Sequence, residues 1–177
     1  MNNLTLRRSD MLKLVDMPAR PFDAMLARNQ APWPRRETGR AWGEFSTEDA
    51  YRVALAHALV RQGRSYDEAG VAIRSEFENL LKFKSAVTGD LLFGTFITET
   101  VPSEEDGVRW REVVFAPESM WFSEMARIKD VIAKDDILIA FAAVNATSVM
   151  RRTLVKAQRA ELVDRQLLKL AAKVRAV

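Results

Sequence analysis

The chain has 177 residues, of which 48% are hydrophobic and 29% charged, and its formal net charge is +3. This length suffices for one sizeable core, or for two small domains that share an interface. There is no cysteine and one histidine, His57. This composition excludes disulfides, thiolate catalysis, cysteine-bound zinc and multi-histidine metal sites.

No apolar run reaches the roughly 18 residues that would span a bilayer. The first residues also lack the apolar segment of a signal peptide. We therefore expect a cytoplasmic protein that makes no membrane contact.

Charge is distributed unevenly along the chain. Residues 1–84 hold 14 basic and 11 acidic side chains, residues 85–146 hold 5 and 11, and residues 147–177 hold 8 and 2. A nucleic acid would be attracted to the two basic flanks and repelled by the acidic middle. The alternative for the basic tail is that it pairs with the acidic middle.

Two short helices are expected first. Ser9 is a suitable N-cap for the first helix, which should end at Asp16-Met17-Pro18. Pro21 suits the first position of the second helix, over residues 20–28. Its inner face should hold Phe22, Met25 and Leu26, and its outer face Arg20, Asp23, Ala24, Ala27 and Arg28.

A basic loop should follow the second helix. Two prolines around Trp33 stop the helix, and residues 35–40 carry three arginines with Gly39, which predicts a glycine-tipped hairpin. Trp33 and Trp42 are expected to pack beneath it. Two longer helices should come next, one from the Ser46–Asp49 capping box to Gly63 and one from the Ser65–Glu68 box to about Lys84.

The composition changes at residues 87–90, after which β-forming residues dominate. We expect strands over 91–98 and 108–115, a helix over 117–132, a third strand over 137–144, and a final basic helix from Asn145 or Thr147 to about Val174. The predicted fold class is α+β and mostly helical, a winged helix–turn–helix followed by a small three-stranded β element with flanking helices. The predicted domains are 1–86 and 87–177.

The stretch from Arg8 to about Ile73 resembles the MerR-like winged helix–turn–helix domain. The resemblance rests on the order of its parts: residues 9–15, 16–19, 20–28, Pro32, Gly39-Arg40 and 45–49. It implies a recognition helix in the major groove and a basic wing on the flanking backbone. The chain departs from the family at Asp16, where glycine is usual, and at Pro21 and Asp23 in the recognition helix. The family's metal-binding cysteines are absent, so its metal sensing does not carry over.

The candidate DNA contacts follow from this resemblance. Arg8 would meet phosphate, Arg20 and Arg28 would meet a guanine edge or phosphate, and Asp23 would accept a hydrogen bond from a cytosine amino group. The wing would contact the backbone or minor groove through Arg35, Arg36, Thr38 and Arg40. The alternative for each is an ordinary solvated side chain. His57 is interpreted as structural.

We therefore expect a DNA-binding transcriptional regulator that acts as a homodimer, not an enzyme, and that uses neither a metal nor another cofactor. Its C-terminal domain would pair two copies; binding a small effector or RNA polymerase are alternative roles. One alternative function is a phage-type packaging or recombination accessory protein, such as a terminase small subunit or an excisionase. The other is a protein–protein adaptor that has lost DNA binding. The basic C-terminal helix is expected to pack on the fold, with a second DNA-contacting surface as its alternative.

Overall fold

The computed structural model describes residues 4–34, 43–82, 89–100, 109–117, 120–131 and 136–174. Within these ranges the helices are α1 (Arg8–Val15), α2 (Ala19–Ala27), α3 (Thr47–Val60), α4 (Tyr66–Lys82), α5 (Trp121–Val131), α6 (Ala146–Arg159) and α7 (Arg165–Lys173). The strands are β1 (Leu91–Thr100), β2 (Arg109–Pro117) and β3 (Asp136–Asn145). The prediction of a mostly helical α+β fold is confirmed. No helix in these ranges combines the length and the hydropathy needed to cross a membrane.

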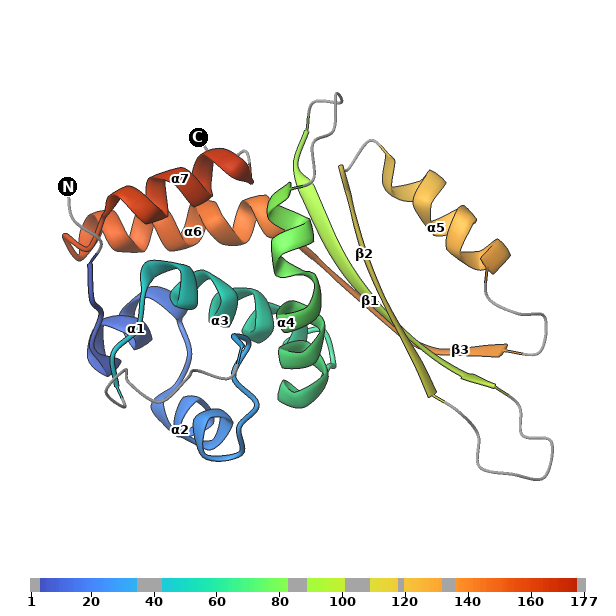
Figure 1. Cartoon of the computed structure of the whole chain (residues 1–177), viewed down its shortest axis with the longest axis horizontal. Coiled ribbons are helices and arrows are strands. Elements are labelled where there is room, and N and C mark those ends of the chain that lie inside the picture. The colour runs from blue at the N-terminus through green and yellow to red at the C-terminus, as the bar shows by residue number, and fades with distance from the viewer. Residues whose placement is uncertain are drawn as a thin grey trace.

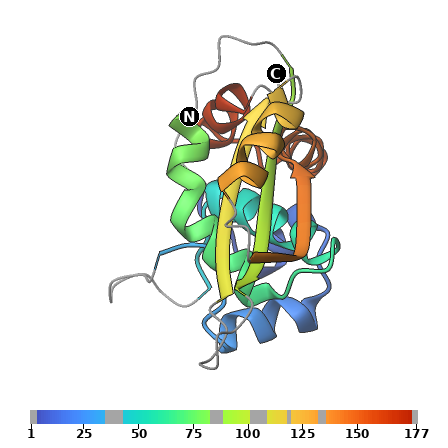
Figure 2. The same ribbon diagram turned by 90° about the vertical axis from the view of Figure 1, so that its right-hand side faces the viewer.

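The elements form a helical body with a sheet beside it. Helices α1–α4, α6 and α7 lie on one side of the sheet, and α5 covers its other face (Figures 1 and 2). The strand order is β2-β1-β3, and β1 pairs antiparallel with both neighbours. Gly94 of β1 lies against the ring of Trp121 in α5, so a side chain at this position would collide with that ring. The lack of a side chain at Gly94 therefore lets α5 approach the sheet closely.

A hydrophobic core among the described residues joins the two halves of the sequence. It holds residues of α1–α4, α6 and α7, together with the first residues of β1 and the last residues of β3. Tyr51 of α3 is fully buried and donates a hydrogen bond to the carbonyl of Ala146 at 3.0 Å. Helices α6 and α7, which follow the predicted division at residues 86/87, therefore pack with the N-terminal helices.

The predicted final helix is wrong in one respect, because it is two helices. Helix α6 ends at Arg159, and Glu161, in the segment between α6 and α7, has a left-handed φ of 57°. Asp164 then caps α7 by accepting from the amide of Leu167 at 2.8 Å. Asp164 is 2% exposed and also accepts from the amide of Leu4 and the hydroxyl of Thr47, each at 2.9 Å. These hydrogen bonds stabilise the interruption between α6 and α7, since they join the start of α7 to Leu4 and to α3.

Two helices, α3 and α4, begin at the capping boxes predicted from the sequence. The capping boxes at Ser46–Asp49 and Ser65–Glu68 are both present. Ser9, however, is not the N-cap of α1. The N-cap lies two residues earlier, at Arg7, whose amide donates a hydrogen bond to the Asp10 carboxylate.

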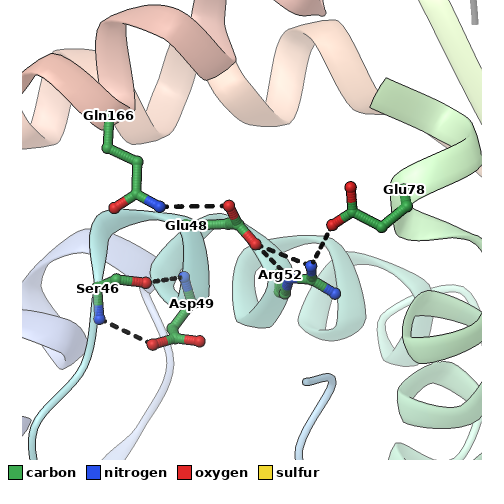
Figure 3. Close-up of polar contacts among 6 residues, drawn as sticks. All are labelled: Ser46, Glu48, Asp49, Arg52, Glu78 and Gln166. Atoms are coloured by element: carbon green, nitrogen blue, oxygen red, sulfur yellow. Dashed lines mark hydrogen bonds and ion pairs between the residues drawn. The ribbon is translucent and has the colours of Figure 1, made fainter. Parts of the chain in front are cut away.

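Arg52 is buried and connects three helices (Figure 3). Its guanidinium donates to Glu48 of α3 at 2.8 Å and to Glu78 of α4 at 3.1 Å. Glu48 in turn accepts from Gln166 of α7 at 3.3 Å. The same guanidinium lies 3.7 Å from the centre of the Phe77 ring. Its polar partners and the ring together compensate for removing this charge from water.

Candidate nucleic-acid interface

The turn between α1 and α2 is held in a left-handed conformation at Asp16. This residue is the C-cap of α1 and has a φ of 58°. Glycine is favoured at such positions because other residues bring their Cβ too close to the backbone, although aspartate and asparagine tolerate them. The carboxylate of Asp16 lies 3.1 Å from Nζ of Lys156 in α6. The hydrogen bond from Lys156 is the main cause that lowers the pKa of Asp16.

Helix α2 is fixed by its inner face. Phe22 and Met25 are almost completely buried, and the Phe22 ring meets Phe45 edge to face with centroids 5.7 Å apart. The opposite face is exposed, as predicted, at Arg20, Asp23, Ala24, Ala27 and Arg28. Helix α2 lies at the lower edge of the helical body in Figure 1, on the side away from α6 and α7.

Arg8 and Asp23 form a two-point ion pair that the sequence did not reveal. Nε of Arg8 donates to one carboxylate oxygen of Asp23 at 2.8 Å, and Nη2 donates to the other at 2.6 Å. The hydrogen bond raises the pKa of Arg8 and lowers that of Asp23. Both side chains are exposed. The pair joins the first residue of α1 to the middle of α2 and cancels the charge of both groups on this surface.

Arg20 and Arg28 stand at the two ends of α2. They are eight residues apart, which is about 12 Å along a helix axis. Both side chains are exposed, and neither forms an ion pair with any residue that the structure describes. They are therefore the cations of this surface whose charge is not cancelled by a described neighbour.

The basic loop at 35–42 lies outside the described residues, and with it Arg35, Arg36, Thr38, Arg40 and Trp42. The segments on either side of it are described. Leu6 and Phe45 exchange two backbone hydrogen bonds, at 2.7 and 2.9 Å, as an isolated antiparallel bridge. The ring of Trp33, which precedes the loop, lies 5.8 Å from that of Phe45, which follows it. Phe45, which follows the loop, therefore lies beside Phe22 of α2.

Sequence reasoning missed the contacts that hold the end of α2. Asn29, directly after the C-cap residue of α2, has a left-handed φ of 55°. Arg74 of α4 donates to the carbonyl of Ala31 at 2.5 Å. The backbone of Gly70 in α4 lies against the carbonyl oxygen of Gln30, where a Cβ would collide. A glycine inside an otherwise regular amphipathic helix is a signal for such a close approach.

The basic helix α6 lies away from α2. Arg151 pairs with Asp90 at 3.1 Å, and Lys156 pairs with Asp16. The first of these contacts joins the basic tail to the acidic middle of the chain. Because α6 and α2 lie on different sides of the helical body (Figure 1), they present separate surfaces.

His57 is half-buried, and its Nδ1 lies 3.0 Å from the hydroxyl of Tyr66. In the part of the chain that the structure describes, no three His, Asp or Glu side chains gather as a metal site would need. A scan of protein-family models and a search of curated proteins each find no match to this chain. Function is therefore inferred from the chemistry of the surface around α2.

Proposed function

We propose that this chain is a sequence-specific DNA-binding transcriptional regulator that inserts α2 into the major groove. The observation that carries the proposal is the exposed face of α2, where Arg20 and Arg28 stand about 12 Å apart with no described acidic partner. Arginines at both ends of an exposed helix suit a base edge at one end and a phosphate at the other.

The surroundings of α2 support a winged helix–turn–helix. A tight turn with a left-handed residue at Asp16 sets α2 beside α1. The Leu6–Phe45 bridge returns the chain to α2 after the basic loop. Arg35, Arg36, Thr38 and Arg40 belong to that loop and would follow the flanking backbone or minor groove. In this proposal the loop is the wing.

The Arg8–Asp23 pair changes the role proposed for Asp23. Both of its carboxylate oxygens accept from Arg8, so in this proposal Asp23 orients that guanidinium instead of reading cytosine. The pair engages Nε and Nη2 of Arg8 and leaves Nη1 to donate to a phosphate. Asp23 is thus a positioning residue.

The proposal includes a homodimer that works in the cytoplasm. Two copies of α2 would enter successive major grooves, with half-sites separated by about one helical turn. The dimer, not the single chain, would set the length of the operator.

The test is fluorescence anisotropy with a duplex enriched from a random pool and with a shuffled duplex, each over a salt series. Arg20→Ala should weaken binding to the enriched duplex by about tenfold or more and reduce the preference over the shuffled one. Arg40→Ala should weaken binding to both duplexes and lower the salt dependence by about one phosphate contact. Arg165→Ala on α7 is the matched control and should leave both affinities unchanged. Equal effects of Arg20→Ala and Arg165→Ala would refute the assignment of α2.

The same surface also suits a protein partner, as an adaptor would need. The Arg8–Asp23 pair cancels charge beside α2, and Ala24 and Ala27 give its exposed face a small apolar strip. Wild-type protein that shows no salt-sensitive binding to any duplex would select this alternative.

A further inference from the structure

A recess of about 400 Å³ opens where α1, α3, α6 and the end of β3 meet. This volume falls within the range of sites that hold small organic molecules. None of Arg8, Arg20, Asp23 or Arg28 lines it, so it shares none of these four residues with the surface proposed to meet DNA.

Two helices supply most of the wall through a regular spacing. Helix α3 contributes Ala54, His57 and Ala58, and its C-cap residue Arg61 follows, at steps of three and four residues that place them on one face. The two alanines leave space between the helices. Arg61 stands at the end of this row, near the C-terminus of α3.

Helix α6 presents a matching row. Ser148, Val149, Arg152 and Lys156 follow the same steps of three and four residues. Val149 adds an apolar side chain to the alanines of α3, while Arg152 and Lys156 add two cations. The recess is therefore lined by small apolar side chains together with positively charged ones.

The charges that line the recess do not balance. Three cations, Arg61, Arg152 and Lys156, face one carboxylate, Asp16. Asp16 lies 3.1 Å from Lys156, and its pKa is lowered first by that hydrogen bond and further by the charge of Arg152. Neither Arg61 nor Arg152 forms an ion pair with another described residue. Two positive charges thus remain beside the one that Asp16 neutralises.

We propose that this recess binds a small organic anion that carries two negative charges, a phosphomonoester or a dicarboxylate. Arg61 and Arg152 would donate to the anionic oxygens, because a guanidinium offers paired donors that fit either group. The carbon skeleton would rest on Ala54, Ala58 and Val149. The anion would also compete with Asp16 for Lys156, so Asp16 would lower the affinity of the recess for the anion.

The test is titration calorimetry on the full chain, together with thermal denaturation, at constant ionic strength. The probes are glycerol 3-phosphate and malate, with acetate and chloride as comparison anions. Both Arg152→Gln and Arg61→Gln should weaken binding about tenfold or more, since each removes a charge-assisted hydrogen bond. Arg159→Gln is the matched control, because Arg159 is exposed on the same helix but does not line the recess. Its affinity should stay within about twofold of wild type.

Asp16→Asn gives a result of opposite sign. Asparagine tolerates the left-handed turn, and its neutral amide releases Lys156. The affinity should rise about two- to fivefold, the range expected when a partly exposed ion pair no longer competes. A position that merely supports the fold would not tighten binding when substituted.

The outcome with each anion distinguishes between the possible ligand classes. Binding of glycerol 3-phosphate alone assigns the phosphomonoester, binding of malate alone assigns the dicarboxylate, and binding of both supports a general dianion site. The proposal is overturned if neither probe binds better than acetate or chloride, or if Arg159→Gln costs as much as Arg152→Gln. It is also overturned if Arg152→Gln weakens only duplex binding, because the cations would then belong to a nucleic-acid surface.

Discussion

The imidazole of His57 sits in a position that favours its neutral form. Its ring lies parallel to that of Tyr66, with centroids 6.4 Å apart, and its Nδ1 is within hydrogen-bond distance of the Tyr66 hydroxyl. Partial burial lowers its pKa, and the nearby charge of Arg61 lowers it further. Protonation therefore opposes folding at this site.

This gives a pH dependence with a definite sign. The unfolded chain binds the proton more tightly, so the contribution of His57 to stability is fully present above its unfolded pKa of about 6.5. It is lost as the pH falls from that value through the lower folded pKa. Urea denaturation between pH 5.5 and 7.5 should show stability rising with pH. His57→Gln should flatten this rise, because His57 is the only histidine of the chain. An unchanged slope in the variant would contradict the assignment.

Arg8 and Asp23 show what single residues in a sequence conceal. Helical spacing places Asp23 correctly on the exposed face of α2, together with Arg20 and Arg28. The ion pair with Arg8 depends on how α1 is oriented against α2, and no local pattern encodes that angle. The sequence thus predicts exposure at these positions but not which charges cancel.

At the level of elements, the contact between α2 and α4 depends on one missing side chain. Gly70 lies inside α4, in its N-terminal half, where alanine would ordinarily favour the helix by about 1 kcal/mol. Here a Cβ would collide with the carbonyl oxygen of Gln30, directly after α2. Because that neighbour is backbone, the α2 end must move to make room.

We expect Gly70→Ala to destabilise the protein by about 1–3 kcal/mol, the usual cost of overpacking. The measurement is the free energy of unfolding in urea. Ser75→Ala is the matched control on the same helix, at an exposed position, and should change stability by less than about 0.5 kcal/mol. A stabilised Gly70→Ala variant would mean that helix propensity outweighs the collision. In that case α4 would not fix the end of α2.

Helix starts are readable from the sequence because they are local. Ser46 with Asp49 and Ser65 with Glu68 each complete a capping box within four residues. The break between α6 and α7 is not readable in this way. It places a non-glycine residue, Glu161, in a left-handed conformation. The hydrogen bonds that stabilise this conformation are donated to Asp164 by Leu4 and Thr47, more than a hundred residues away. Distant partners override local helix preference there.

At the scale of the whole molecule, Asp164 joins the N-terminal segment of the chain to its C-terminal helix α7. One carboxylate oxygen accepts from Thr47 and from the amide of Leu167, and the other accepts from the amide of Leu4. The segment that starts at Leu4 continues to Leu6, which pairs with Phe45 after the basic loop. Asp164 therefore anchors the chain that leads into α1 and borders that loop.

Asp164→Asn should release the N-terminal segment selectively. The amide oxygen can still accept from Thr47 and Leu167, but the NH₂ group then faces the amide of Leu4, and two donors cannot bond. We expect a loss of about 1–3 kcal/mol in the free energy of unfolding. Hydrogen exchange should show reduced protection at the amides of Leu4 and Leu6, with α3 and α4 less affected. Asp67→Asn makes the same change in charge at an exposed site and should alter neither measurement. Full protection at Leu4 and Leu6 in Asp164→Asn would mean that the bridge to Phe45 holds this segment without Asp164.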